Sequence, residues 1–364
     1  MRILDRYILM ETLIPLLFGL TAFTSLFIGT DLVNLSQMIV RYGAPWGVLV
    51  EMLLLKTPEF LVWTFPMAML MATLLSLSKL SGTSELVAMR AGGVSYYRLI
   101  MPVLLIALVV SVVTIGINEI LVPVADQRYQ QILYERVYRK ELPKVTSNIM
   151  LDEYSKGRLS RIIYAVQFDS STKTMRDVSI IQFEQGRPVQ QVSASRLVWE
   201  KDHWYLEDGI IYLFNPSSEG PVTKLSFLGG RQELPLAYQP QDIPRITKRP
   251  DKMTIRELKA QMLILQENPE KLREYQLQYH LKFSIPFASL VFALVGAPLG
   301  IQSHRSARST GFGLSIVIIF IYYILLTMGS AMVQGGYLAA PIGAWWQNAA
   351  LLLVGLYLIW KAPK

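Results

Sequence analysis

The chain has 364 residues, of which 52% are hydrophobic and 17% charged, with a formal net charge of +8. Its apolar residues gather in runs near both ends while the middle third is polar, which is typical of a membrane protein rather than a soluble one. The absence of cysteine excludes disulfides and thiolate metal sites, and His203, His280 and His304 are far apart in the sequence. We therefore expect no metal site and no cofactor.

Six apolar runs are long enough to cross a membrane, because a helical span needs about 20 residues. They cover, approximately, residues 9–32, 58–78, 99–121, 283–301, 311–333 and 341–360. The first run is too long for a signal peptide and no small-residue cleavage site follows it, so it is predicted to be a span. The sequence thus predicts a membrane α-helical protein with six transmembrane helices in two groups of three.

Basic residues in the short loops divide unequally between the two sides of the membrane. One side holds nine of them: Arg2, Arg6, Lys79, Arg90, Arg98, Arg305, Arg308, Lys361 and Lys364. The other side holds two, Arg41 and Lys56. By the positive-inside rule, both termini are expected in the cytoplasm and the central domain on the outer side of the membrane.

Between the two groups of spans, residues from about 145 to 245 predict an inserted all-β domain. Strands are expected at residues 161–169, 175–183, 189–200, 204–214 and 222–228, with turn residues at 169–171, 185–188, 201–202 and 215–217. Short strands at this spacing favour a sandwich or a jelly-roll-like domain. The predicted domains are 1–123 with three spans, 124–280 with the β domain and flanking helices, and 281–364 with three spans.

Helices are expected on both sides of the β domain. Residues 125–139 are predicted to prolong the third span outward. Thr254 and Glu257 form a capping box that opens a helix to about Gln266. Asn268 and Pro269 then begin the helix that leads into the fourth span.

The loop between the second and third spans contains a short predicted helix at about 83–92. Thr83 or Ser84 can cap it, Glu85 lies in its first turn, and the glycines at 92–93 end it. One interpretation is an ordinary loop in which Glu85 is favoured by the helix dipole. The other is a coupling helix that docks into a motor subunit. Since no G-x-x-x-x-G-K-[ST] motif occurs, any ATP-driven work must come from another subunit.

Two stretches of the sequence are distinctive: S-E-L-V-A-M-R-A-G-G at 84–93 and P-F-A-S-L-V-F-A-L-V-G-A-P-L-G at 286–300. They resemble motifs of the LptF/LptG (YjgP/YjgQ) family of lipopolysaccharide-transport permeases. Together with the order of three spans, β domain and three spans, the resemblance extends over essentially the whole chain. Which of the two paralogues the chain is like stays open.

The resemblance implies a non-enzymatic permease subunit of an ABC transporter in the bacterial inner membrane. This transporter extracts lipopolysaccharide and passes it to a periplasmic bridge of jelly-roll type. The implied partners are a cytoplasmic ATPase dimer and a second permease subunit, either a paralogue or a second copy; no nucleic acid is expected. The family's ATPase contact falls on Glu85, and we take Glu85, Met89 and Arg90 as candidate coupling residues.

A lipid substrate needs a protected apolar path, because one exposed twelve-carbon chain costs about 10 kcal/mol at roughly 0.8 kcal/mol per CH₂. Alternation in the predicted strands gives candidate groove residues Ile162, Tyr164, Val166, Phe168, Ile210, Tyr212 and Phe214. An anionic head group could meet Arg41, Arg128 and Arg136. The ordinary alternatives are a closed sandwich core for the first set and solvated or interfacial charges for the second.

Small residues in the spans permit close helix contact. In the fourth span they are Ala293, Gly296, Ala297 and Gly300; Gly29, Gly311 and Gly313 are candidates for a lateral gate, which the family forms between first and fifth spans.

An ion-driven secondary transporter or channel is the main alternative function. Such proteins usually place ionisable residues deep within their spans. Here residues 283–364 contain no acid, and the other acids lie near membrane ends: Glu11, Asp31, Glu59 and Glu119. A lipid-modifying enzyme is a second alternative, but the sequence offers no nucleophile with a base near the interface. A permease of the lipoprotein-release kind would carry four spans, with its domain after the first.

Overall fold

The computed structural model describes residues 3–138, 145–155, 158–169, 172–184, 186–214, 221–236, 238–240, 248–302 and 307–361. It divides into two compact units, a helical unit of Met1–Ile132 with Gln276–Lys364 and a β unit of Leu133–Tyr275. Several residues used in the sequence analysis lie outside the described ones: Arg2, His304, Arg305, Lys364, residue 139 and the turn residues 170–171, 185 and 215–217.

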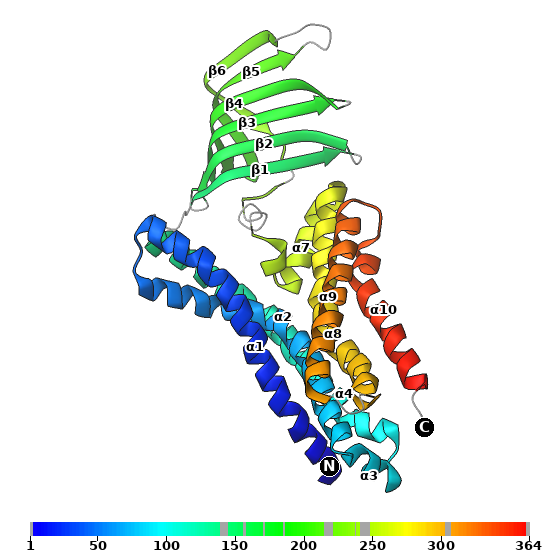
Figure 1. Cartoon of the computed structure of the whole chain (residues 1–364). Helices are drawn as coiled ribbons and strands as arrows, with labels where there is room; N and C mark the ends of the chain where they lie inside the picture. The colour runs from blue at the N-terminus through cyan, green and yellow to red at the C-terminus, as the bar shows by residue number, and fades with distance from the viewer. Residues whose placement is uncertain are drawn as a thin grey trace. The chain divides into compact units, whose positions relative to one another are not determined.

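Six helices in the described part of the chain are long and apolar enough to cross a membrane, which confirms the predicted number (Figure 1). They are α1 (Ile3–Tyr42), α2 (Trp46–Gly82), the helix that starts with α4 (Tyr96–Gly116), α8 (Pro269–Gln302), α9 (Ala307–Gln334) and α10 (Ala340–Lys361). The short α3 (Glu85–Ala91) lies between the second and third.

The first two spans are longer than the sequence predicted. Their apolar runs end at about 32 and begin at about 58, yet α1 continues to Tyr42 and α2 starts at Trp46. The added turns bury Leu35 and Ile39 on α1, so the apolar periodicity persists beyond the span. Gly43, with φ of +64°, then ends α1 in the left-handed region that glycine tolerates.

The third span also continues beyond its apolar run, as the sequence predicted. The five-residue π-helical segment η1 (Ile117–Leu121) joins α4 to α5 (Val122–Ile132), and a second one, η2 (Leu133–Val137), follows. The continuous helix thus runs through Val137. Segments of π-helix are often found at functional sites because they displace side chains from their regular positions.

The second and fourth spans form the centre of the helical unit. In their most apolar windows, 78% of α2 and 72% of α8 is buried, against 17% of α1. Small residues bring α2 and α8 together: a Cβ added to Gly300 would lie 2.9 Å from the Cβ of Leu77. Gly29 and Gly313 have no such neighbour within 4 Å. The small residues of the fourth span therefore serve contact within the chain.

A buried polar network joins α8, α9 and α10. The Asn348 amide donates to the Ser284 carbonyl at 2.8 Å, and the Tyr322 hydroxyl donates to Asn348 Oδ1 at 3.2 Å. Gln347 Nε2 adds a bond of 3.1 Å to Ser284 Oγ. Hydrogen bonds between apolar spans resist separation because the freed groups would face hydrocarbon. The last three spans therefore form one connected block.

The described residues of the β unit form a sheet of six antiparallel strands, each paired with its neighbour in the sequence (Figure 1). They are β1 (Val145–Ser155), β2 (Arg158–Asp169), β3 (Thr174–Glu184), β4 (Arg187–Glu200), β5 (His203–Phe214) and β6 (Pro221–Leu234). The inserted β domain is thus confirmed, and β1 is an additional strand. The strand order of the sheet is that of a meander, because each strand pairs with the strands next to it in the sequence, whereas a jelly roll proper contains Greek-key crossings.

One face of this sheet carries the core of the β unit. Across the sheet, Ile163 pairs with Ile180 and Ile180 with Val192, and all three are buried. Farther along β2 the buried residue is Phe168, three positions after the buried Ala165 rather than two or four. We call this the inner face and the opposite one the outer face.

The same three-residue spacing between buried residues occurs in other strands of the sheet. In β3 it falls between the buried residues Met175 and Val178, beside Asp177 with φ of +50°. In β5 it falls beside Asp208, also at φ of +50°. Such irregularities insert a residue, bend the strand and reverse its alternation. They keep apolar residues on the inner face along the whole strand length.

The segment after β6 closes part of the inner face. Tyr238 is 6% exposed within the core, and its hydroxyl donates to the Asp152 carbonyl at 2.7 Å. Its own carbonyl accepts from Trp204 Nε1 at 2.8 Å. Arg161 donates to the Pro235 carbonyl at 2.9 Å. This segment therefore joins β1 and β5 over one end of the inner face.

Among the described residues after β6, the β unit contains three short helical elements: η3 (Pro250–Lys252), α7 (Ile255–Ile264) and η4 (Leu265–Glu267). The predicted capping box is present, since Thr254 accepts from the Glu257 amide and Glu257 accepts from the Thr254 amide. Asn268 Oδ1 accepts from the Lys271 amide at 3.0 Å, which confirms the predicted start of α8. Local capping chemistry thus fixes both helix starts.

Candidate functional site

The loop between the second and third spans folds into α3, a helix of two turns. Ser84 precedes it in the left-handed region with φ of +61°, and Gly93, with φ of +82°, follows it. No side-chain capping hydrogen bond is present at Ser84, so the expected cap is not made. The Thr83 hydroxyl instead lies within hydrogen-bonding distance of the Lys79 carbonyl and of the Glu85 carboxylate. Glu85 lies in the first turn and Arg90 in the last, as the helix dipole favours.

The Glu85 carboxylate is bonded within the chain rather than extended into solvent. Tyr7 on α1 donates its hydroxyl proton to Glu85 Oε2 at 2.7 Å. The Thr83 hydroxyl lies 2.9 Å from Glu85 Oε1 and 3.1 Å from the Lys79 carbonyl, which compete for its single proton. The hydrogen bond from Tyr7, more than any other contact, lowers the pKa of Glu85 below its ordinary value. The side chain is therefore held as a carboxylate.

The rest of α3 has one buried and one exposed side. Leu86 is 2% exposed and packs in the core of the helical unit, with Met89 half-buried against the same cluster. Val87 is 61% exposed. Of the predicted coupling residues, Glu85 and Met89 thus contact other parts of the chain, and Arg90 is half-buried. Val87 was missed, although its position between Leu86 and Met89 on a short helix could have indicated it.

Two of the predicted head-group cations lie in the helical unit, at the end of the long helices opposite α3, and the third belongs to the β unit. Arg41 is exposed in the last turn of α1. Arg128 is exposed on α5, where it donates to Gln131 Oε1 at 2.5 Å. Arg136 is exposed on η2, which belongs to the β unit. All three side chains are exposed, and Arg136 belongs to a different unit from Arg41 and Arg128.

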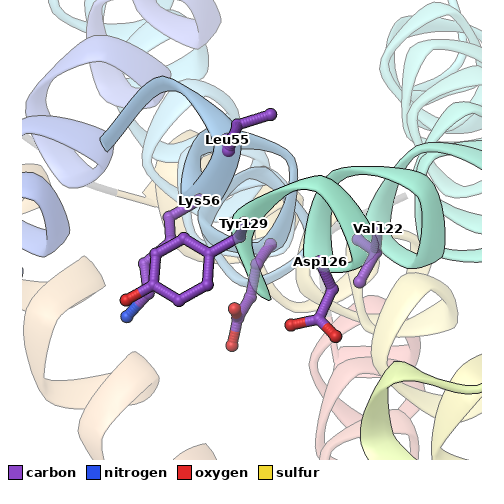
Figure 2. Close-up of a pocket in the computed structure, with 6 residues that line it drawn as sticks. Leu55, Lys56, Val122, Asp126 and Tyr129 are labelled. Atoms are coloured by element: carbon purple, nitrogen blue, oxygen red, sulfur yellow. The ribbon is translucent and has the colours of Figure 1, made fainter. Parts of the chain in front are cut away.

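A small pocket lies between α2 and α5 at this end (Figure 2). Lys56 bonds to Asp31 of α1 at 2.7 Å, and its ammonium lies 5.4 Å from the centroid of the Tyr129 ring. Glu59 and Asp126 also line the pocket. Lys56 is thus paired with an acid and lies near an aromatic ring, and two further acids line the same pocket. Sequence analysis counted Lys56 as a loop charge and missed this environment.

Lys282 on α8 is a buried cation that sequence analysis did not single out. Its side chain is 5% exposed, and its Nζ lies 3.0 Å from the Asn118 carbonyl and 3.6 Å from Glu119 Oε2. Both partners belong to the π-helical segment η1. A buried ammonium requires such partners because desolvation of an isolated charge is costly. Lys282 therefore ties the fourth span to the third.

Acids of the spans pair with lysines of other helices. Glu11 of α1 lies 2.6 Å from Lys79 of α2, Asp31 pairs with Lys56, and Glu119 with Lys282. Within the described residues, no group of three or more His, Cys, Asp or Glu could hold a metal ion. These acids are engaged in helix contacts, which disfavours a chain of free carboxylates for ion transport.

The predicted groove residues do not share one face of the sheet. Phe168 is fully buried on the inner face, whereas Ile162 and Tyr164 lie on the outer face. Ile210 and Tyr212 also lie on the outer face, since they alternate with Gly209 and Ile211, which pair with buried inner-face residues of β4. The prediction of a common face for the β2 residues was wrong, because the irregularity between Ala165 and Phe168 reverses the alternation. Val166 lies at this irregularity, and Phe214 at the end of β5; both are partly buried.

The inner face is closed at one part and open at another. Towards β6, Ile211 and Phe227 are only partly buried, and Leu213 and Leu225 are 37% and 51% exposed. Leu225 pairs with Ile211, which pairs with the buried Val192, so these residues continue the core row. The core thus extends without a break into exposed apolar surface near the last strand. We call Ile211, Leu213, Leu225 and Phe227 the open apolar row.

Together these features define a polytopic membrane protein with a short, anchored helix between its second and third spans and an inserted β domain. The family described as "Lipopolysaccharide export system permease LptF/LptG" matches residues 6–361, so the chain belongs to this family. It is a lipopolysaccharide export permease subunit, as the two sequence motifs predicted.

Two curated relatives agree with the family match. The chain is 22% identical to the lipopolysaccharide export system permease protein LptG of Escherichia coli K12 over 323 residues. The aligned region covers 85% of this chain and 84% of that protein. The LptG protein of Escherichia coli O6:H1 strain CFT073 matches with the same identity and coverage. The likeness therefore spans both groups of helices and the inserted domain.

Proposed function

We propose that this permease is the membrane subunit of an ABC transporter that extracts lipopolysaccharide from the inner membrane and passes it to a periplasmic bridge protein of jelly-roll type. A cytoplasmic ATPase dimer supplies the energy. A second permease subunit, a paralogue or another copy, pairs with this one around a cavity for the lipid. Both termini are cytoplasmic and the β domain is periplasmic, which the nine-to-two division of basic residues in the short loops supports.

The main support for the proposal is that α3, at the end of the helical unit where α1 begins, is packed against the spans on one side and exposed on the other. Leu86 anchors this helix in the core while Val87 is left exposed. An anchored helix with an exposed apolar residue is suited to dock into a groove of a partner and to transmit its movement to the spans. Since the sequence lacks a phosphate-binding loop, the permease itself is expected to hydrolyse no ATP.

The motor contact is tested by changing the exposed residue of α3. Val87→Lys should reduce copurification of the ATPase while leaving the permease folded, because Val87 has no core contact to lose. Val40→Lys, an equally exposed change near the other end of α1, is the matched control. Glu85→Lys should also weaken the association. ATP turnover by the purified permease alone, or unchanged ATPase binding by Val87→Lys, would contradict the motor assignment.

The head-group contact is assigned to Arg41, Arg128 and Arg136, whose exposure is compatible with binding an anionic lipid. A photo-crosslinker at each of these positions should capture lipopolysaccharide from native membranes. Leu353, 68% exposed on α10, is the control for lipid contact in general. Equal labelling at Leu353 would show that the arginine positions are not special.

Acyl chains leaving the membrane are proposed to follow an apolar surface of the β domain. The open apolar row supports a path on the inner face, where it continues a closed core. The outer-face residues Ile162, Tyr164, Ile210 and Tyr212, expected from the sequence, form the alternative path. Leu225→Asp and Tyr164→Asp separate the two, since both positions are exposed and the domain should remain folded. The change that stalls lipid transfer to the bridge identifies the face.

The main alternative remains an ion-coupled transporter. Copurification from native membranes, with identification of bound lipid and associated subunits, decides between the two. Lipid transfer that requires ATP and persists when ionophores abolish the ion gradients supports the proposal. Transfer abolished by ionophores in the presence of ATP would refute it.

A further inference from the structure

The contact between α1 and α3 joins segments that are far apart in the sequence. Tyr7 and Glu85 are separated by 78 residues, and their side chains meet at 2.7 Å. A hydrogen bond to an ionised carboxylate is shorter and roughly twice as strong as one between neutral groups. The bond therefore links the beginning of the first span directly to the short helix.

A second charged contact lies one helical turn farther along α1. Glu11, four residues after Tyr7 and so on the same face, bonds to Lys79 of α2 at 2.6 Å. Between them on the adjoining face, Ile8 is fully buried in the core. The start of α1 is thus held to α2 and α3 by two side-chain bonds and a buried anchor.

The remaining surface of α1 leaves this helix weakly enclosed. Its most apolar window is 17% buried, the lowest value among the candidate spans of the described chain. Ile14, Leu17 and Phe18 are 60% exposed or more. One side of α1 packs along α2 while its other side is largely uncovered, so bonds at the end of α1 help to set its position relative to α3.

We infer that Tyr7 is a positioning residue that transmits displacement of α3 to α1 through its hydrogen bond to Glu85. This inference rests on the proposed function, in which a motor acts on α3. It gives Glu85 a role inside the permease that does not require direct contact with the motor. Thr83, which directly follows α2, lies 2.9 Å from the same carboxylate, so the Glu85 side chain connects α1, α2 and α3.

The inference predicts an uncoupled transporter when the hydroxyl is removed. In the assembled complex with its ATPase, Tyr7→Phe should leave ATP hydrolysis within about twofold of the unmodified complex. Lipid delivered per ATP should fall about five- to tenfold, the effect of one charge-assisted hydrogen bond at a partly exposed site. Tyr97→Phe is the control, because Tyr97 is 63% exposed at the start of α4.

A structural readout separates transmission from a general loss of function. The sequence has no cysteine, so single cysteines at Met10 and Ala91, both exposed, can carry spin labels on α1 and at the end of α3, away from the motor contact at Val87. Their distance distribution should be narrow in the unmodified complex and broader with Tyr7→Phe. In a Glu85→Ala background, Tyr7→Phe should add nothing further, since both changes remove the same bond. Glu85→Gln, which keeps an acceptor oxygen, should retain part of the coupling.

The outcomes for the inference and for the proposed function are distinct. If the unmodified permease binds no ATPase or transfers no lipid with ATP, the proposed function fails whatever Tyr7 does. If the unmodified complex transfers lipid and Tyr7→Phe leaves either the yield per ATP or the label distances unchanged, the inference is wrong. Loss of ATPase association in Tyr7→Phe would also overturn it, because Tyr7 would then be needed for docking rather than transmission.

Discussion

The inner face of the β domain provides a quantitative test, because Phe168 and Leu225 lie on the same face in different environments. Phe168 is fully buried and its ring centroid lies 6.4 Å from that of Trp204, so Phe168→Ala should cost about 3–5 kcal/mol of stability. Leu225 is 51% exposed. Since full burial of a leucine is worth about 1.5–3 kcal/mol, Leu225→Ala should cost about 1 kcal/mol.

Protease susceptibility of the full-length permease in nanodiscs measures this difference. The transiently open population of the β domain sets the cleavage rate, so a gap of about 3 kcal/mol predicts cleavage roughly 100-fold faster for Phe168→Ala than for Leu225→Ala. Leu225→Ala should nevertheless slow lipid transfer, and the outer-face change Tyr164→Ala should not. Equal protease sensitivity of the two inner-face variants would refute the division into a closed core and an open row.

Three further predictions concern the helical unit. Gly300→Leu should reduce the folded yield sharply, because its Cβ would overlap α2. Gly313→Ala, whose Cβ would have no neighbour within 4 Å, should be neutral or stabilising by up to about 1 kcal/mol. Thermal unfolding of the detergent-solubilised protein measures both effects. Asn348→Leu should lower stability by about 1–3 kcal/mol in the same assay, since it leaves the Ser284 carbonyl buried without its donor. The pKa of Glu85 is lowered, so its contribution to the α1–α3 contact should be complete above the ordinary glutamate range and disappear as the pH falls through the lowered value; broadening of the spin-label distances only near neutral pH would contradict this.

The sequence predicted those features that depend on neighbouring residues. The six spans follow from the length of apolar runs, and the capping box at Thr254 from a four-residue pattern. The family motifs in the second loop and the fourth span also led to the family that the comparison shows. Each of these signals lies within about 25 residues, so no knowledge of the packing is needed to recognise it.

The prediction of strand faces from the sequence was wrong where a backbone irregularity interrupts the alternation of β2. Strict alternation placed Ile162, Tyr164 and Phe168 on one face, yet the strand irregularity between Ala165 and Phe168 separates them. A strand needs one extra residue to exchange its faces, and the sequence around Val166 contains no glycine or proline to indicate it. The irregularity aligns with those at Asp177 in β3 and Asp208 in β5, which lie outside the short stretch of sequence around Val166.

By itself, then, the sequence determined the membrane class, the order of the domains, the starts of several helices and the family. The tertiary structure decided which charges meet: Tyr7 with Glu85, and Lys282 with the segment η1. Hydropathy and capping act through the backbone within a few turns, so a single stretch of residues reveals them. Side-chain pairs between helices depend on crossing angle, rotation and register, and these are fixed only when the apolar faces of the whole unit pack together.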